Sequence, residues 1–314
     1  MTRSVIAGTG GYLPVRALTN DELAEAYGLD TSDAWISERT GIRRRHMAAP
    51  GETTADMAAA AAREALAQAG ADAAEVDAII LATATPDSAF PSTATRVQEK
   101  LGIRQGFSFD ISAACTGFIY ALGVADSMIR TGHCRSALVI GAEAFTRILD
   151  WTDRGTCVLF GDGAGAVLLR AEGGEGDRGI LSTHLHSDGR HGDILQVEGG
   201  LVRMAGREVF RHAVAKLASA VDEALAANGL AQADVQWLVP HQANRRIIDA
   251  MGRKLGLPAE RVVVTVDRHA NTSAASIPLA LAEATRDGRV ARGDLVLMEA
   301  IGGGLTWGAA LARF

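Results

Sequence analysis

Cys115 is the residue of this chain best suited to nucleophilic chemistry, and it lies in the stretch Ile111-Ser-Ala-Ala-Cys-Thr-Gly-Phe118. Residues 107–111 have the pattern of a short buried strand, and residues 117–130 have the length of a helix that ends at Thr131-Gly132. We therefore expect Cys115 at a helix start, where free N–H groups and the helix dipole favour a thiolate. The dipole contributes at most about 2 kcal/mol, so neighbouring groups must complete the activation. The alternative is an inert cysteine that fills a tight bend.

The composition is that of a globular protein that does not coat nucleic acid. The chain has 314 residues, of which 48% are hydrophobic and 22% charged, with a formal net charge of −6. Its three cysteines, Cys115, Cys134 and Cys157, predict no disulfide framework and no zinc site, and they favour a reducing compartment. No apolar run is long enough for a signal peptide or a membrane span. We expect a cytoplasmic protein.

The second half of the chain repeats features of the first. Residues 64–81 and 223–240 are identical at seven of eighteen positions without gaps, at an offset of 159. Four further pairs follow in the same order, at offsets of 143 to 157, which indicates a duplicated βα unit. They are residues 100–103 with 254–257, 107–111 with 263–267 (expected as strands), 137–140 with 294–297, and 165–170 with 308–313.

Each half is expected to alternate strands and helices. This pattern predicts an α/β fold, a five-layered αβαβα sandwich of two duplicated halves with mainly parallel mixed sheets. The acidic, glycine-rich stretch of residues 172–179 is the candidate boundary. We therefore divide the chain into halves of residues 1–172 and 173–314.

The repeat also predicts which side chains share a pocket. With an offset of 156, Cys115-Thr116 falls on Asn271-Thr272, so both would follow a strand and open a helix. With an offset of 159, His241 falls on Ala82, at the carboxyl end of a strand, where sites of parallel sheets gather. Cys115, His241 and Asn271 are therefore candidates for one pocket. Taken alone, His241 is also compatible with a structural role and Asn271 with a helix cap.

Two glycine-rich or basic stretches complete the candidate site. Gly302-Gly303-Gly304 follows a predicted strand, and its backbone N–H groups together with that of Cys115 would form an oxyanion hole; a simple turn is the alternative. Residues 33–46 are polar and basic around a single Trp35. They fit either a solvated loop or a site for a planar anionic ligand.

A Cys–His–Asn set also suits a papain-like hydrolase, in which the Asn orients the His. Here Asn271 would instead open its own helix, so His241 and Asn271 would both donate to one thioester carbonyl oxygen. Two such donors stabilise the enolate that forms when a malonyl thioester loses CO₂, and an acyl group on Cys115 would be its electrophile. This arrangement predicts acyl transfer with carbon–carbon bond formation.

The chain resembles the β-ketoacyl-acyl-carrier-protein synthase III family, thiolase-fold enzymes that start bacterial fatty-acid synthesis. The resemblance runs from about Val5 to Phe314. It is carried by six segments: residues 35–45 (WISERTGIRRR), 112–118 (SAACTGF), 153–166 (DRGTCVLFGDGAGA), 240–247 (PHQANRRI), 271–278 (NTSAASIP) and 302–308 (GGGLTWG).

The resemblance implies a role for each matching residue. Cys115 would accept the acyl group, His241 and Asn271 would promote decarboxylation, and the N–H groups of Cys115 and Gly303 would form the oxyanion hole. Phe90 would reach into the acyl pocket of a partner subunit, which implies a homodimer. The remaining assignments are CoA binding by Thr31, Trp35, Arg39, Arg154 and Asn244, an acyl pocket that includes Leu305, and carrier-protein docking by Arg246, Arg211, Arg253 and Lys254.

The implied reaction is a ping-pong condensation of acetyl-CoA, a substrate rather than a cofactor, with malonyl-acyl-carrier protein. Ile301 and Leu305 stand where phenylalanines are common in the family, which bears on the starter acyl group, and Arg207 stands where some members carry Asn near the CoA channel. Three other functions stay open from the sequence. They are a related acyltransferase of secondary metabolism, a Cys-dependent thioester hydrolase and a non-catalytic partner subunit.

Overall fold

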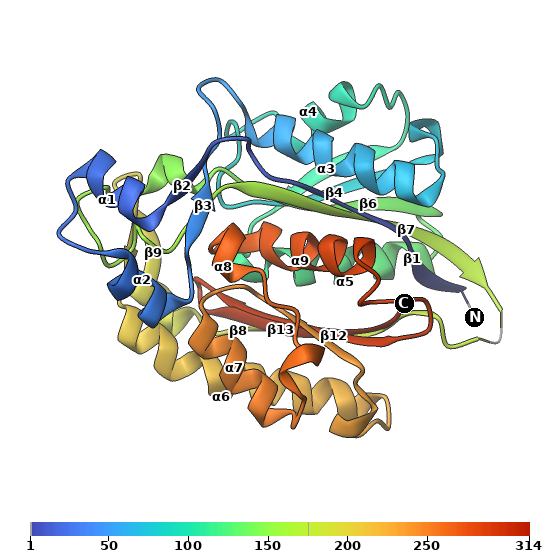
Figure 1. The fold of residues 1–314 in the computed structure, drawn as a ribbon. Coiled ribbons are helices and arrows are strands. Elements are labelled where there is room, and N and C mark those ends of the chain that lie inside the picture. The colour runs from blue at the N-terminus through green and yellow to red at the C-terminus, as the bar shows by residue number, and fades with distance from the viewer. Residues whose placement is uncertain (1, 175) are drawn as a thin grey trace.

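Two β-sheets, each covered by helices on both faces, form five layers in the computed structural model, which describes residues 2–174 and 176–314 (Figure 1). The first sheet has the order β1 (Thr2–Tyr12), β7 (Gly163–Gly173), β6 (Ser136–Glu143), β4 (Ala78–Ala82) and β5 (Phe107–Ile111). The second has the order β11 (Trp237–Pro240), β12 (Leu295–Gly302), β13 (Thr306–Arg313) and β8 (Gly179–Ser187).

The helices make up the other three layers. One outer layer contains α3 (Thr54–Ala69) and α4 (Thr93–Lys100), and the other contains α6 (Gly206–Ala227) and α7 (Arg245–Lys254). Between the sheets, α5 (Gly117–Arg130) and α9 (Ser276–Arg286) pack on both of them through a common apolar cluster. The predicted five-layered sandwich is therefore confirmed.

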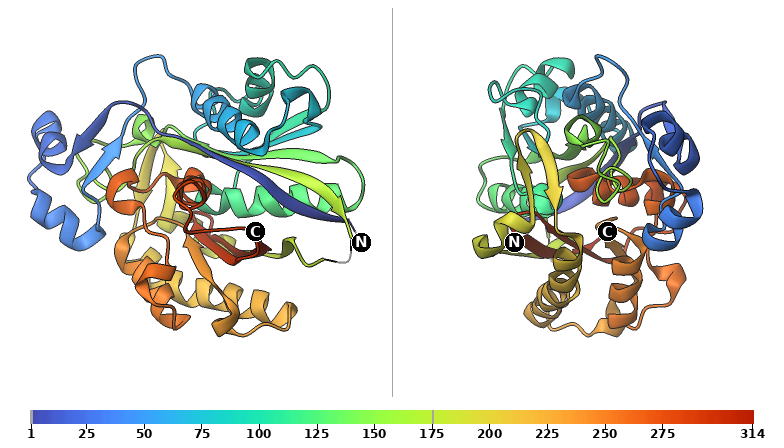
Figure 2. Two further views of the ribbon diagram at one scale, coloured as in Figure 1. Left: turned by 45° about the vertical axis from the view of Figure 1, so that its right-hand side comes forward. Right: turned by 90° about the vertical axis from the view of Figure 1, so that its left-hand side faces the viewer.

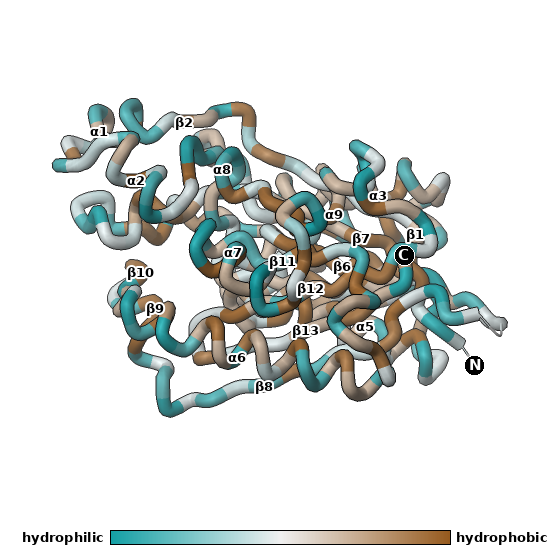
Figure 3. The backbone as a smooth tube through the Cα atoms, turned by 60° about the horizontal axis from the view of Figure 1, so that its bottom comes forward, coloured by the Kyte–Doolittle hydropathy of each residue, from teal (hydrophilic) through white to brown (hydrophobic). Residues whose placement is uncertain are grey.

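Smaller elements gather at one end of the sandwich. They are β2 (Ala17–Thr19), α1 (Asn20–Tyr27), α2 (Asp33–Thr40), β3 (Arg44–His46), the β9–β10 hairpin (Leu195–Glu198 and Leu201–Met204) and α8 (Val266–His269). α2 packs against both α1 and α7, and Figure 2 shows the blue segment that contains α1 and α2 at this end of the molecule. The hydropathy colouring in Figure 3 places hydrophobic residues along the central strands, whereas α7 and the peripheral helices carry many hydrophilic ones.

The duplication appears in the strand order. In space, β1-β7-β6-β4 of the first sheet corresponds to β8-β13-β12-β11 of the second. The first sheet ends at Gly173 and the second begins at Gly179, on either side of the stretch that we take as the boundary between the halves.

Two predictions about strands need correction. The sheets are mixed but not mainly parallel, since β7 and β13 run antiparallel to both of their neighbours; no crossover helix precedes either strand, so the chain simply returns beside the previous one. The strand expected over residues 263–267 is absent. A single parallel bridge at Val262 marks its place, and the chain turns into α8 at Val266.

Local signals explain where several helices begin. Thr53 caps α3 and forms a capping box with Asp56, and Thr19 does the same for α1 with Glu22. The predicted helix over residues 117–130 is confirmed as α5. The strand before it, β5, lies at a sheet edge and is only partly buried, unlike the buried strand that its apolar residues predict. None of the described helices is both long and apolar enough to cross a membrane.

The outer layer packs on the first sheet through very close backbone contacts. α3 presents a row of buried alanines to β1, and Gly10 of β1 faces it. A Cβ at Gly10 would lie 2.2 Å from the carbonyl oxygen of Ala61, which is closer than real Cβ contacts. This approach lets the helix lie flat on the strand, and it explains the alanine-rich sequence of α3.

Gly10→Ala should lower the free energy of unfolding by about 1–3 kcal/mol, because the added methyl group would meet the backbone of Ala61 and Ala65 and the Cβ of Glu64, none of which can swing aside. Chemical denaturation measures the change. Gly173→Ala is the matched control, since a Cβ there meets open space; it should change stability by less than about 0.5 kcal/mol. Equal effects of the two substitutions would contradict the packing argument.

Candidate active site

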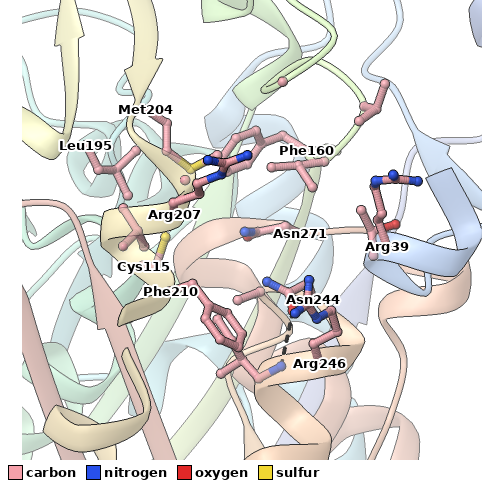
Figure 4. Close-up of a pocket in the computed structure, with 18 of the residues that line it drawn as sticks. Arg39, Cys115, Phe160, Leu195, Met204, Arg207, Phe210, Asn244, Arg246 and Asn271 are labelled. Carbon is pink, nitrogen blue, oxygen red and sulfur yellow. Dashed lines mark hydrogen bonds between the residues drawn. The ribbon is translucent and has the colours of Figure 1, made fainter. Parts of the chain in front are cut away.

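A cavity of about 590 Å³ contains the three residues that the repeat predicted to lie together, Cys115, His241 and Asn271 (Figure 4). Each is at least nine-tenths buried, with exposed fractions of 5%, 4% and 6%. They come from three separate segments: the turn before α5, the residue after β11 and the segment before α9. The cavity therefore brings both halves of the chain to one site.

Cys115 lies in the 3₁₀ turn η2 (Ala114–Thr116), between β5 and α5. Ala114 has a φ of 45°, in the left-handed region that L-residues rarely adopt, and this turns the chain sharply before the nucleophile. The same construction recurs in η7 (Ser273–Ala275) before α9, where Ser273 has a φ of 50°. This symmetry sets the offset at 159, so the counterpart of Cys115 is Ala274. The predicted pairing of Cys115 with Asn271 is wrong.

The backbone of β12 closes on Cys115. A Cβ on Gly302 would lie 2.6 Å from the Cys115 nitrogen, so only glycine permits this approach. Gly303 follows in the turn between β12 and β13, against the Leu195 carbonyl oxygen. Among the described residues, neither the Cys115 N–H nor the Gly303 N–H donates to a protein acceptor outside the regular strand and helix bonds. Both groups are therefore candidate donors to a ligand.

Burial controls the charge of Cys115. Removal from water raises the pKa of the thiol to about 12, and the nearby Glu143 carboxylate adds to this rise, whereas the Ser273 hydroxyl opposes it. The helix dipole acts in the lowering direction but amounts to about 1.5 pKa units at most. Burial therefore opposes the thiolate that the helix start was expected to favour.

His241 is held as a neutral ring. Its backbone N–H donates to the Glu299 carbonyl oxygen (2.8 Å), and its Nδ1 lies 2.6 Å from the Ser276 hydroxyl. Burial lowers the pKa of the imidazole to about 3, because a charged ring would lose its hydration without gaining a carboxylate partner. The predicted position at the carboxyl end of a strand is confirmed, since β11 ends at Pro240.

Asn271 is fixed by its backbone and by its side-chain oxygen. Its N–H donates to the Leu159 carbonyl oxygen (2.9 Å), and its own carbonyl oxygen accepts from Gly161 (3.0 Å). The side-chain Oδ1 accepts from the Ser273 N–H (2.9 Å), which leaves the amide Nδ2 as the group that can donate to a ligand. Asn271 does not cap α9, whose N-cap is Ala275.

Aromatic and basic residues line the outer part of the cavity. The guanidinium carbons of Arg39 and Arg154 lie 4.5 and 5.2 Å from the ring centre of Trp35, and Arg154 also contacts Asp30, the neighbour of Thr31. Arg246 lies 5.0 Å from the Phe210 ring. Of the described residues that line the cavity, none carries a carboxylate. The lining therefore suits an anionic ligand with a planar group.

Asn244 caps α7 through its Oδ1, which accepts from the Ile247 N–H (3.1 Å; dashed in Figure 4), and its amide nitrogen can donate to a ligand. Arg207, on the first turn of α6, also lines the cavity, and Figure 4 shows it beside Met204. Ile301 lines the cavity, but Leu305 does not, because it is fully buried in the core cluster under α6 and α7.

Four other predicted residues lie on the surface or outside the cavity. Phe90 is 86% exposed. Arg211 and Arg253 are exposed, and Lys254 pairs with Asp222 (3.3 Å). The apolar wall of the cavity could not be predicted from the sequence, because only tertiary packing brings its members together. They are Val158, Leu159, Phe160, Leu195, Met204, Val209, Phe210 and Ile247.

The lowered pKa of His241 predicts an acid-dependent loss of stability. Below its ordinary value of 6.5 the unfolded chain binds a proton at this residue, whereas the folded chain does not until about pH 3. The contribution of the neutral His241 ring to the free energy of unfolding is therefore complete above pH 6.5 and falls as the pH drops toward 3. As the pH falls through this window, the free energy of unfolding of His241→Gln should rise relative to that of the wild type by about 1.4 kcal/mol per pH unit. Isothermal denaturation at several pH values measures this difference.

The comparison with the variant isolates His241 from buried carboxyls that act in the opposite sense. Burial raises the pKa of Glu143 to about 7 and that of Glu299 to about 8, so both stabilise the fold as the pH falls. Wild type and variant share the effects of these two carboxyls, which therefore cancel when the two free energies of unfolding are subtracted. A difference that does not change with pH would contradict a neutral buried His241.

Comparison with known proteins agrees with this geometry. Two family models match the chain, "3-Oxoacyl-[acyl-carrier-protein (ACP)] synthase III" over residues 109–189 and its C-terminal model over residues 225–314. A protein from Acidiphilium cryptum named β-ketoacyl-[acyl-carrier-protein] synthase III is 67% identical and covers 100% of both chains. One of the same name from Rhodospirillum centenum is 66% identical over 99% of both.

A solved structure extends the likeness to three dimensions. The 3-oxoacyl-[acyl-carrier-protein] synthase III from Aquifex aeolicus superposes with a TM-score of 0.95 at 50% identity, covering 99% of this chain and 100% of that one. The match spans both sheets and every segment that contributes to the cavity. The chain described here therefore belongs to the β-ketoacyl-[acyl-carrier-protein] synthase III family.

Proposed function

We propose that the protein starts fatty-acid synthesis by condensing acetyl-CoA with malonyl-acyl-carrier protein to give acetoacetyl-acyl-carrier protein, CoA and CO₂. The observation that carries this proposal is the cavity that Cys115, His241 and Asn271 line together, which combines a thiol, a neutral imidazole and an amide nitrogen. A hydrolase would need an Asn that orients the His. Here the Asn271 amide oxygen is occupied by Ser273 instead, which disfavours that alternative.

The first half-reaction is acyl transfer to Cys115. The sulfur attacks the thioester carbonyl carbon, the carbon–sulfur bond to CoA breaks, and the thiol proton leaves with CoA as its thiol. The free N–H groups of Cys115 and Gly303 stabilise the oxyanion that forms. Because burial disfavours a free thiolate, proton loss and bond formation are expected to be coupled.

The second half-reaction is decarboxylation and condensation. The malonyl thioester loses CO₂, and its carbonyl oxygen gains negative charge as an enolate. His241 and Asn271 donate hydrogen bonds to this oxygen. The enolate carbon then attacks the acyl carbon on Cys115, the carbon–sulfur bond breaks, and the released thiolate takes up a proton from solvent. A neutral donor suits this step, because it stabilises the enolate without first protonating its carbon.

The outer cavity is the proposed binding region for the substrate arms. Trp35, flanked by two guanidinium groups, offers a stacking surface for the adenine of CoA. Thr31 does not line the cavity, so its predicted part in CoA binding rests on the family resemblance alone. The Asn244 amide nitrogen is the proposed donor to the pantetheine. Arg246, together with Arg211, Arg253 and Lys254, forms the proposed docking surface for the acidic carrier protein; Arg246 has no ion-pair partner among the described residues, so its charge is available.

We also propose a homodimer in the cytoplasm. Phe90 is a large apolar side chain with 86% of its surface exposed, as expected for a residue that enters the partner's acyl pocket. β5 is the edge strand of the first sheet, paired with β4 on one side only, and its exposed Phe107 gives a second apolar surface for association. The three free buried cysteines fit a reducing compartment. No cofactor is needed for the proposed chemistry.

The function predicts a mass increase of one acetyl group on the Cys115 peptide after incubation with acetyl-CoA. Addition of malonyl-acyl-carrier protein should then remove the label and yield a β-ketoacyl product. Cys115→Ala should abolish both steps. Cys134→Ala, a buried cysteine outside the cavity, is the control. Labelling that decays only to free acetate would identify a hydrolase instead, and no labelling would refute the mechanism.

Arg246→Glu should raise the KM for malonyl-acyl-carrier protein by about tenfold or more, because it places a like charge opposite an acidic surface. Acetylation of Cys115 by acetyl-CoA should change far less. Rates of the two half-reactions, measured separately, provide the check. The matched control is Arg63→Glu, an arginine on the α3 face far from the cavity. Equal loss of both half-reactions would argue against docking.

A further inference from the structure

The hydrogen bond at the inner nitrogen of His241 defines how the ring is protonated. The Ser276 Oγ lies 2.6 Å from Nδ1 of His241, and both residues are buried. The same Oγ accepts a hydrogen bond from the backbone N–H of Gln242 (3.3 Å). Ser276 is the first residue of α9, so the contact links the helix of the middle layer to the end of β11.

Counting the protons leaves one arrangement. A serine hydroxyl has a single proton to donate, and its oxygen already accepts from Gln242. If Nδ1 of His241 carried the ring proton, it would donate to Ser276, and the hydroxyl proton would have no acceptor among the described residues. A buried donor without an acceptor is costly. The hydroxyl therefore donates to Nδ1, and the ring proton lies on Nε2.

We propose that Ser276 is a positioning residue that fixes His241 in the Nε2–H tautomer, so that the ring presents an N–H donor to the cavity. This inference rests on the proposed function, because the donor serves the decarboxylation step. The same short segment orients the second donor, since the Ser273 N–H holds the Asn271 oxygen and turns its amide nitrogen outward. Residues 271–276 thus determine that both His241 and Asn271 present an N–H group, and not an acceptor, to the cavity.

The direct test is nitrogen NMR of protein labelled with ¹⁵N-histidine, which does not depend on activity. The chain has eight histidines, and the His241 signals are those lost in His241→Gln. In the wild type at neutral pH, we expect an unprotonated Nδ1 and a protonated Nε2. In Ser276→Ala, the two signals should move toward each other as both tautomers become populated. A protonated Nδ1 in the wild type, or unchanged signals in the variant, overturns the proposal.

The kinetic test separates the half-reactions. Ser276→Ala should slow CO₂ release from malonyl-acyl-carrier protein by about 10- to 100-fold, as is typical when an orienting partner of a histidine is lost. Acetylation of Cys115 should stay within about twofold, because that step does not use His241. Ser276→Thr keeps the hydroxyl and should restore decarboxylation.

Ser136→Ala is the matched control, a buried serine at the far end of β6 whose hydroxyl donates to the Glu75 carbonyl oxygen. It should leave both half-reactions at the wild-type rate. The proposal is contradicted if Ser276→Ala decarboxylates malonyl-acyl-carrier protein at the wild-type rate, or if it loses both half-reactions equally. A wild type that fails to condense the substrates refutes the proposed function alone, and the NMR result then decides the tautomer by itself.

Discussion

The site depends on backbone segments of the two halves that approach more closely than a Cβ would allow. Gly302 of β12 lies against the Cys115 nitrogen, and Gly141 of β6 lies against the Ala274 carbonyl, where a Cβ would come within 2.1 Å. These contacts press η2 and η7 together between the two sheets. As a result, the nucleophile of one half and the donors of the other share one dehydrated space, although they are more than 120 residues apart in the chain.

Dehydration then determines the charge of each group. It keeps the Cys115 thiol and the His241 ring neutral, and it raises the pKa of the buried Glu143 carboxyl near the cysteine to about 7. The carboxylate form of Glu143 is nevertheless supported by donors from Ala84 and Thr85. Neutral donors and a protonated thiol are stable in such surroundings, whereas a preformed ion pair would be expensive to bury. Neither the Cys115 thiol nor the His241 ring therefore has to hold a buried charge before it meets a substrate.

Much of this could be predicted from the sequence, because caps, apolar patterns and the internal repeat are local signals. The five layers, the helix after Cys115 and the position of His241 follow from them. The repeat is a less reliable guide to which single residues of the two halves are equivalent. The sequence match alone allowed an offset of 156, and only the paired positive φ angles of Ala114 and Ser273 show that 159 applies.

The missed features depend on tertiary contacts. Residues 263–267 have strand-like composition, but the edge of the second sheet accepts only one bridge before the chain must turn toward Asn271. The pKa of Cys115 depends on its burial, and that burial cannot be predicted from the neighbouring residues in the sequence. Phe160 and Phe210 form part of the cavity wall only because α6 and the segment before β7 meet there.

The arginines of the cavity have a consequence for the way a ligand arrives. The chain carries a formal net charge of −6, yet its cavity is lined by four arginines, Arg39, Arg154, Arg207 and Arg246, and by no carboxylate among the described residues. An anionic molecule that diffuses toward the protein is repelled by most of the surface and attracted at the mouth of the cavity. Such a field selects productive orientations during the encounter itself and weakens as ionic strength rises. The arginines therefore act on the association rate before any of them touches the ligand.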